Sequence, residues 1–219
     1  TGRPANPASP APFAVDMEKR SDDWRVFRPA GEMVTTGFIF YPGGLVHPEA
    51  YDAFARAIAA QGYLVVVPPM PLNLAVLAPN TAQQIIAAFP EVRRWAIGGH
   101  SLGGAMAAQF VATHPTAAQG LALWAAYPPD NASLATWNGQ VVSIAGTLDG
   151  RATPATIEAS KPLLPPSTRF VVIEGGNEVG GVSVRKGVVV FTETASTAQG
   201  MPADAWAKWM GRSGKVRPL

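Results

Sequence analysis

The chain has 219 residues, of which 47% are hydrophobic and 15% are charged, and it contains no cysteine. This composition excludes an intrinsically disordered chain, a disulfide framework and a thiolate metal site. The net charge is only +2, and no basic face is interleaved with aromatic residues, so nucleic-acid binding is not expected. No apolar run approaches the ~20 residues of a membrane-spanning helix, so no membrane span is expected.

Residues 1–12 are rich in Pro and Ala, and the chain does not begin with Met. We expect this stretch to be a flexible stub left after processing. Residues 13–219 are of a length typical of one domain. The processed start favours an exported protein, and the sequence leaves a cytoplasmic location open.

Strands and helices alternate along most of the chain. Residues 33–41 and 63–67 are apolar runs without polar alternation, which is typical of parallel strands buried on both faces. Further strands are predicted at 24–28, 92–97, 121–126, 141–145 and 169–173, and helices at 48–61, 81–89, 102–113 and 154–164. The alternation predicts an α/β fold with a doubly wound, mostly parallel sheet flanked by helices.

The pattern changes after residue 177. Valines alternate on both sides of residues 186–187, which predicts a hairpin over 180–194, and a short helix is predicted at 203–210. The hairpin is expected at the periphery, where its unpaired edge would allow a homodimer to form.

One sequence motif indicates a catalytic residue. Gly99, Ser101 and Gly103 spell G-x-S-x-G between a predicted strand and a predicted helix, which is the context of a nucleophile elbow. On such a turn Ser101 Oγ faces the substrate, and the N–H of Leu102 lies beside the reacting carbonyl. The alternative is a glycine-rich corner with a solvated serine.

A serine nucleophile needs a base, and the base needs an orienting acid. On this kind of fold the acid and then a histidine follow the serine, at the carboxyl ends of the strands. Asp149 follows the strand predicted at 141–145 and is the candidate acid, with Asp130 as the alternative.

Several stretches together resemble the α/β-hydrolase superfamily, and most closely its small, lidless carboxylesterase-like branch. They cover about residues 30–177 and read FYPGG (40–44), QGYLV (61–65), MPLNLA (70–75), GGHSLGG (98–104), AGTLD (145–149) and IEGGN (173–177). The resemblance implies ester hydrolysis through an acyl-serine and a fold without a cap domain. It also implies Asp149 as the acid, and Gly44 with Leu102 as oxyanion donors.

The chain departs from this family at Glu178, which stands where the family has its histidine. The three histidines of the chain all precede Glu178. His100 is expected to pack beside the nucleophile, and His114 is expected to end the following helix. His47 is expected to lie in the loop on the oxyanion side. Glu178 would be a far weaker base than imidazole. The atypical part 178–219 is either a natural divergence or the product of a reading-frame change.

These features predict a serine carboxylester hydrolase for small, uncharged esters with short acyl chains, impaired by the missing histidine. Met70, Leu72 and Leu74 are the expected substrate-binding residues, because they form an apolar lining. No cofactor or metal is expected, since the histidines and carboxylates form no close cluster. Two alternatives remain: a weak or inactive hydrolase-fold protein that binds small molecules, and an acyltransferase that uses the same acyl-serine.

Overall fold

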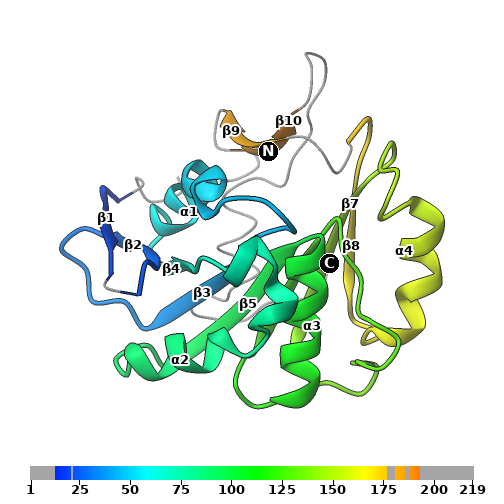
Figure 1. Ribbon diagram of the computed structural model, residues 1–219, viewed down its shortest axis with the longest axis horizontal. Coiled ribbons are helices and arrows are strands. Elements are labelled where there is room, and N and C mark those ends of the chain that lie inside the picture. Colours follow the sequence, from blue (N-terminus) through cyan, green and yellow to red (C-terminus); the bar gives the residue numbers. More distant parts are fainter. Residues whose placement is uncertain (1–12, 21, 177–180, 186–187, 193–219) are drawn as a thin grey trace, which may run out of the picture.

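An eight-stranded sheet forms the centre of the molecule, with helices on both of its faces (Figure 1). The computed structural model describes residues 13–20, 22–176, 181–185 and 188–192. The strands are β1 (Val15–Lys19), β2 (Arg25–Pro29), β3 (Thr36–Tyr41), β4 (Leu64–Val67), β5 (Arg94–His100), β6 (Gly120–Trp124), β7 (Gln140–Gly146) and β8 (Arg169–Ile173). Their order in the sheet is β1-β2-β4-β3-β5-β6-β7-β8. β1 and β2 run antiparallel to their neighbours and the other strands are parallel, which confirms the predicted α/β class.

Helices connect the parallel strands except β6 and β7, which are joined by a loop. The helices are α1 (Asp52–Ala59), α2 (Thr81–Ala88), α3 (Leu102–Thr113) and α4 (Pro154–Ser160), with 3-10 turns η1 (Pro48–Tyr51), η2 (Pro71–Asn73), η3 (Ala75–Leu77) and η4 (Lys161–Leu163). None of these helices is long and apolar enough to cross a membrane, and that finding covers the described residues alone.

Two separate apolar layers hold the helices to the sheet, because successive strand residues face opposite sides. Ile39 and Ile97 belong to the layer that includes Phe110 of α3, and Phe38 belongs to the layer that includes Phe54 of α1. The side chains of these five residues are almost completely buried. This arrangement explains why the central strands read as continuous apolar runs in the sequence.

The structure differs from the sequence prediction at several element ends. β1 was not expected, because its residues are mostly charged and exposed, as is common for an edge strand. The helix predicted at 48–61 begins instead as the turn η1, with Pro48 in its first turn, and α1 ends before Gly62, whose φ is 93°. β5 begins later than predicted and continues to His100, which pairs with Trp124.

The hairpin strands lie outside the main sheet. β9 (Gly181–Arg185) and β10 (Val188–Thr192) pair antiparallel, with Arg185 opposite Val188, and form a two-stranded sheet of their own. β9 lies against α1 (Figure 1). The hairpin is therefore confirmed in its backbone pairing, and its role in a dimer stays a prediction. The expected stub 1–12 and helix 203–210 lie outside the described residues.

The corner between β5 and α3 is packed backbone against backbone. A Cβ at Gly103 would lie 2.3 Å from the carbonyl oxygens of Tyr41 and Pro42, at the end of β3. A Cβ at Gly99 would lie 2.4 Å from the carbonyl carbon of Gly103. Only glycine fits at these two positions, because the backbone segments lie too close together for a side chain between them.

We predict that Gly103→Ala lowers the melting temperature by at least about 2–4 °C, because overpacking costs at least ~1 kcal/mol in a chain of this size. Gly150→Ala is the matched control, since a Cβ there meets nothing within 4 Å. Thermal unfolding followed by circular dichroism compares the two variants. Equal melting temperatures for both would show that the corner tolerates a side chain.

Candidate functional site

Ser101 is the residue between β5 and α3, and its backbone is strained. It has φ 50° and ψ −121°, outside the regions that a non-glycine residue normally occupies. Its N–H donates to the carbonyl oxygen of Trp124 at the end of β6, over 2.8 Å. The serine is partly buried and lies at the carboxyl edge of the sheet, where the sequence places the elbow.

Backbone strain is concentrated at the same edge. Five of the six described non-glycine residues with positive φ follow the ends of β3, β4, β5 and β6, and they are Leu45, Leu72, Asn73, Ser101 and Ala125. Each such residue costs on the order of 1–3 kcal/mol and is tolerated only where its surroundings impose it. Strain gathered in neighbouring loops is typical of a functional site.

The loop after β3 is held by Tyr51. The Tyr51 hydroxyl accepts a hydrogen bond from the Gly43 N–H over 2.9 Å and lies 3.0 Å from His100 Nδ1. Burial raises the pKa of Tyr51 to about 12, so this hydroxyl is neutral at pH 7. The next residue, Gly44, lies beside α3: a Cβ there would be 3.4 Å from Leu102 Cδ2.

The loop after β4 forms an apolar wall beside Gly44. A Cβ at Gly44 would lie 3.8 Å from Leu74 Cδ2. Leu72 is 78% exposed, whereas Met70 is buried in the core layer that contains α3. Tyr41 anchors this loop, because its hydroxyl donates to the Pro79 carbonyl over 2.9 Å and accepts from the Ala82 N–H over 2.8 Å.

Asp149 follows β7 and is only 4% exposed. Its Oδ1 accepts hydrogen bonds from the N–H groups of Arg151 over 2.8 Å and Ala152 over 2.9 Å. Its Oδ2 is buried and has no hydrogen-bond partner among the described residues. The alternative acid, Asp130, is exposed, so only Asp149 has the environment of a fixed carboxylate.

The loops after β7 and β8 are joined by hydrogen bonds. The N–H of Leu148 donates to the Gly176 carbonyl over 2.8 Å, and the N–H of Gly175 donates to Thr147 Oγ1 over 2.9 Å. The glycine turn after β8 therefore lies next to Asp149. Glu178, the residue at the family's histidine position, lies outside the described residues.

The three histidines lie in different surroundings. His100 pairs with Tyr51, as described above, on the side of the Gly43 loop. His47 has a side chain that is 77% exposed, with Nδ1 4.0 Å from Glu49 Oε2. His114 stacks on Phe110 at the end of α3, about 20 Å along the helix from Ser101.

Sequence reasoning missed the two tyrosines. Tyr51 and Tyr41 each hold a loop of the site through a buried hydroxyl. Tyr51 also contacts His100, 49 residues away, and Tyr41 binds Ala82, 41 residues away. No local pattern marks such a hydroxyl. Among the residues that the structure describes, no group of three or more His, Asp or Glu side chains could hold a metal ion.

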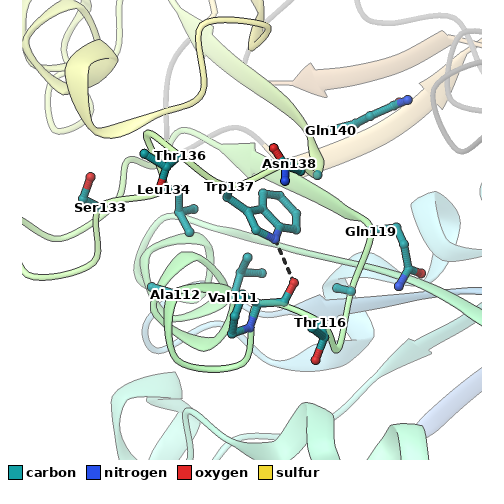
Figure 2. A pocket seen from close by; sticks show the side chains of 13 residues that line it. Val111, Ala112, Thr116, Gln119, Ser133, Leu134, Thr136, Trp137, Asn138 and Gln140 are labelled. Carbon is teal, nitrogen blue, oxygen red and sulfur yellow. Dashed lines mark hydrogen bonds between the residues drawn. The ribbon is translucent and has the colours of Figure 1, made fainter.

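A separate groove of about 870 Å³ lies at the opposite end of α3 (Figure 2). Trp137 lies in its middle and donates from Nε1 to the Pro115 carbonyl over 2.9 Å. Gln119, Asn138 and Gln140 line it as well, at the start of β6 and β7. The residues that line the groove are all uncharged, and it is not the region that the motifs indicate.

Residues 37–198 match the model of the α/β hydrolase family. Among solved structures, Est1E from Butyrivibrio proteoclasticus, solved with ferulic acid bound, is 11% identical, with a TM-score of 0.59 over 73% of this chain and 90% of Est1E. A predicted CIB-like hydrolase from Thermoplasma acidophilum is 16% identical, with a TM-score of 0.59 over 76% of this chain and 90% of its own.

No curated protein matches the chain. The two solved structures share its fold. At 11% and 16% identity, the likeness shows the fold alone. The family model, by contrast, spans well over half of the 219 residues and includes the strand–turn–helix corner around Ser101. The chain belongs to the α/β hydrolase family.

Proposed function

We propose that this protein is a serine carboxylester hydrolase in which Ser101 attacks the ester and forms an acyl-serine. The observation that carries the proposal is the strained turn at Ser101, with φ 50°, at the carboxyl edge of the sheet. A turn of this kind presents the hydroxyl to a substrate instead of burying it against the sheet. The reaction then releases the alcohol, and water hydrolyses the acyl-serine.

Two backbone N–H groups are suited to bind the oxyanion. Leu102 is the first residue of α3, so its N–H has no partner within the helix. Gly44 lies next to Leu102, and Tyr51 fixes the preceding residue, Gly43. Donors held in place before the reaction stabilise the developing charge without reorganisation, which is commonly worth 10²–10³-fold in kcat per donor.

Asp149 has the properties of the acid in such a site. Two N–H groups fix Oδ1, which leaves Oδ2 to accept from a base. The acid acts by orienting an imidazole and stabilising its charged form. The chain supplies Glu178 in place of that imidazole, so we propose that its hydrolysis is slow.

The surroundings of Ser101 favour small apolar esters. Large apolar side chains are exposed in the loops after β3, β4, β6 and β7, and they are Leu45, Leu72, Val76, Leu77, Tyr127 and Leu148. Leu74 lies beside Gly44 and completes the wall. We therefore propose an uncharged ester with a short acyl chain as the substrate, with Met70 supporting the wall from the core.

A second candidate is a hydrolase-fold protein that only binds small molecules. The observation that favours it is the sequence, which has no histidine after His114. The two candidates differ in whether hydrolysis depends on Ser101.

Ser101→Ala is expected to abolish the hydrolysis of p-nitrophenyl acetate, because the nucleophile is removed. Ser133→Ala is the matched control, since Ser133 is exposed in the groove at the other end of α3 and should leave the rate unchanged. Release of p-nitrophenol measures both. If Ser101→Ala hydrolyses the ester at the parent rate, the second candidate, a protein that only binds small molecules, describes this chain better.

Tyr51→Phe is expected to reduce kcat more than it changes KM. The ring stays 4.9 Å from Phe40, but the buried Gly43 N–H loses its acceptor, which costs about 1–3 kcal/mol of stability and loosens the oxyanion loop. Tyr41→Phe is the control, because it removes an equally buried hydroxyl that binds a different loop. Urea unfolding measures the loss of stability, and steady-state kinetics measures the loss of kcat. An equal loss of kcat in both variants would show that Tyr51 has no special role.

Glu178→His is expected to raise the hydrolysis of short-chain esters by about tenfold or more, because general base catalysis is typically worth ~10²–10⁴ in rate. The gain should shrink when the same change is made together with Asp149→Asn, since the imidazole is then not oriented. Initial rates with p-nitrophenyl acetate provide the measurement. No gain in a folded variant would mean that residue 178 does not reach Ser101.

A further inference from the structure

We propose that the groove at the C-terminal end of α3 is a binding site for a neutral carbohydrate, in which a sugar ring stacks on Trp137. The groove has a volume of about 870 Å³, and every residue that lines it is among those that the structure describes. This volume lies within the ~300–1,000 Å³ typical of small-molecule sites. The groove and Ser101 are at opposite ends of α3, so the inference is independent of the proposed function.

The first support is an indole ring that is held in place while one part of it stays exposed. Trp137 is half-buried and packs against the apolar layer that contains α3. Its Nε1 donates to the Pro115 carbonyl oxygen over 2.9 Å, and its backbone N–H donates to the Leu134 carbonyl oxygen over 2.9 Å. A Cβ at Gly139 would lie 2.2 Å from Trp137 Cζ2 and Cη2, so the ring rests directly on this glycine. The indole is therefore a fixed surface in the middle of the groove (Figure 2).

The second support is the lack of charge around this ring. The 13 residues that line the groove, all of them described, include no Lys, Arg, His, Asp or Glu. Phosphates and carboxylates are bound mainly through charged partners, and the lining offers none to them. An uncharged lining with one fixed aromatic ring favours a neutral ligand.

The third support is the set of amide side chains beside the indole, which belong to Gln119, Asn138 and Gln140. Each amide group offers two N–H donors and one acceptor oxygen. Gln119 Oε1 accepts the Trp95 N–H over 3.0 Å, which orients this amide and leaves its Nε2 to donate to a ligand. The side chains of Asn138 and Gln140 make no hydrogen bond to any other residue that the structure describes.

A sugar ring satisfies the indole and the amides at the same time. The face of an aromatic ring is negative, so it attracts the weakly positive C–H groups on the face of a pyranose. The hydroxyl groups at the edge of the pyranose both donate and accept hydrogen bonds, as the amides do. A purely apolar ligand would remove water from these amides without replacing their hydrogen bonds, which is unfavourable. The combination therefore selects a ligand with an apolar face and a hydroxylated edge.

Titration of the full chain with cellotetraose, a neutral oligomer of β-linked glucose, tests the proposal. Saturation-transfer NMR detects the sugar protons that contact the protein, and we expect the strongest signals from the C–H groups of the ring. Binding should saturate at concentrations up to about 10 mM, which covers a weak single site. Sorbitol is the matched control, because it has the hydroxyl groups without a ring face, and it should not bind. No saturable binding of cellotetraose, or equal binding of sorbitol, would overturn the proposal.

Two variants test whether the indole is the binding surface. Trp137→Ala should weaken cellotetraose binding about tenfold or more, because it removes the stacking surface. Gly139→Ala should also weaken binding, since the new Cβ displaces the indole without removing any other group of the groove. Gly150→Ala is the matched control, because a Cβ there meets nothing within 4 Å, and it should bind as the parent does. Parent affinity in a folded Trp137→Ala would overturn the proposal.

Asn138→Ala keeps the test decisive if Trp137→Ala fails to fold. Asn138 is exposed, so its truncation should preserve the fold and weaken binding about two- to tenfold, the effect of one hydrogen bond. Loss of affinity in Asn138→Ala or in Gly139→Ala would then support the site, and parent affinity in both would overturn it.

Ser101→Ala separates this inference from the proposed function. The variant should bind cellotetraose with the parent affinity, because the groove lies at the other end of α3. Loss of binding in this variant would place the sugar at Ser101 and overturn the assignment to the groove. Ester hydrolysis that does not depend on Ser101 would remove the proposed function and leave the groove assignment untouched.

Discussion

The close contact between the first turn of α3 and the end of β3 is the constraint on which the site depends. Gly103 lies against the carbonyl groups of Tyr41 and Pro42, and Gly99 lies against Gly103, with no room for a Cβ at either position. The chain must therefore reverse from strand to helix within one residue, and Ser101 takes φ 50° to do so. Strain at this residue is a consequence of packing around it, which is how a sparsely populated conformation persists.

Backbone hydrogen bonds link the residues that follow neighbouring strands along the carboxyl edge of the sheet. Ser101 is bonded to the end of β6, Ala125 to β7, and Leu148 to the turn after β8. Asp149 sits within this linked set, with one oxygen fixed and the other unpartnered among the described residues. The site thus combines a rigid serine turn and a fixed carboxylate, so the slow hydrolysis that we propose would follow from the missing imidazole alone.

Much of the fold could be predicted, because buried parallel strands leave continuous apolar runs. β8 has the predicted bounds, whereas β1 was missed because an exposed, charged edge strand has no apolar pattern. The corner at Ser101 follows from local spacing, and the place of Asp149 follows from strand order. The Tyr51 hydroxyl could not be predicted, since its partner His100 is 49 residues away and only the folded chain brings them together.

The most direct test of the central claim is where a fluorophosphonate reacts with the folded protein. Trypsin should release residues 95–151 as one peptide, because no Lys or Arg lies between Arg94 and Arg151, and fragment ions distinguish Ser101 from Ser133 and Ser143 within it. We predict a label confined to Ser101, taken up slowly by the parent and faster by Glu178→His, because the parent lacks an imidazole base. No label on Ser101 in either folded protein, or a label on another serine, would contradict this.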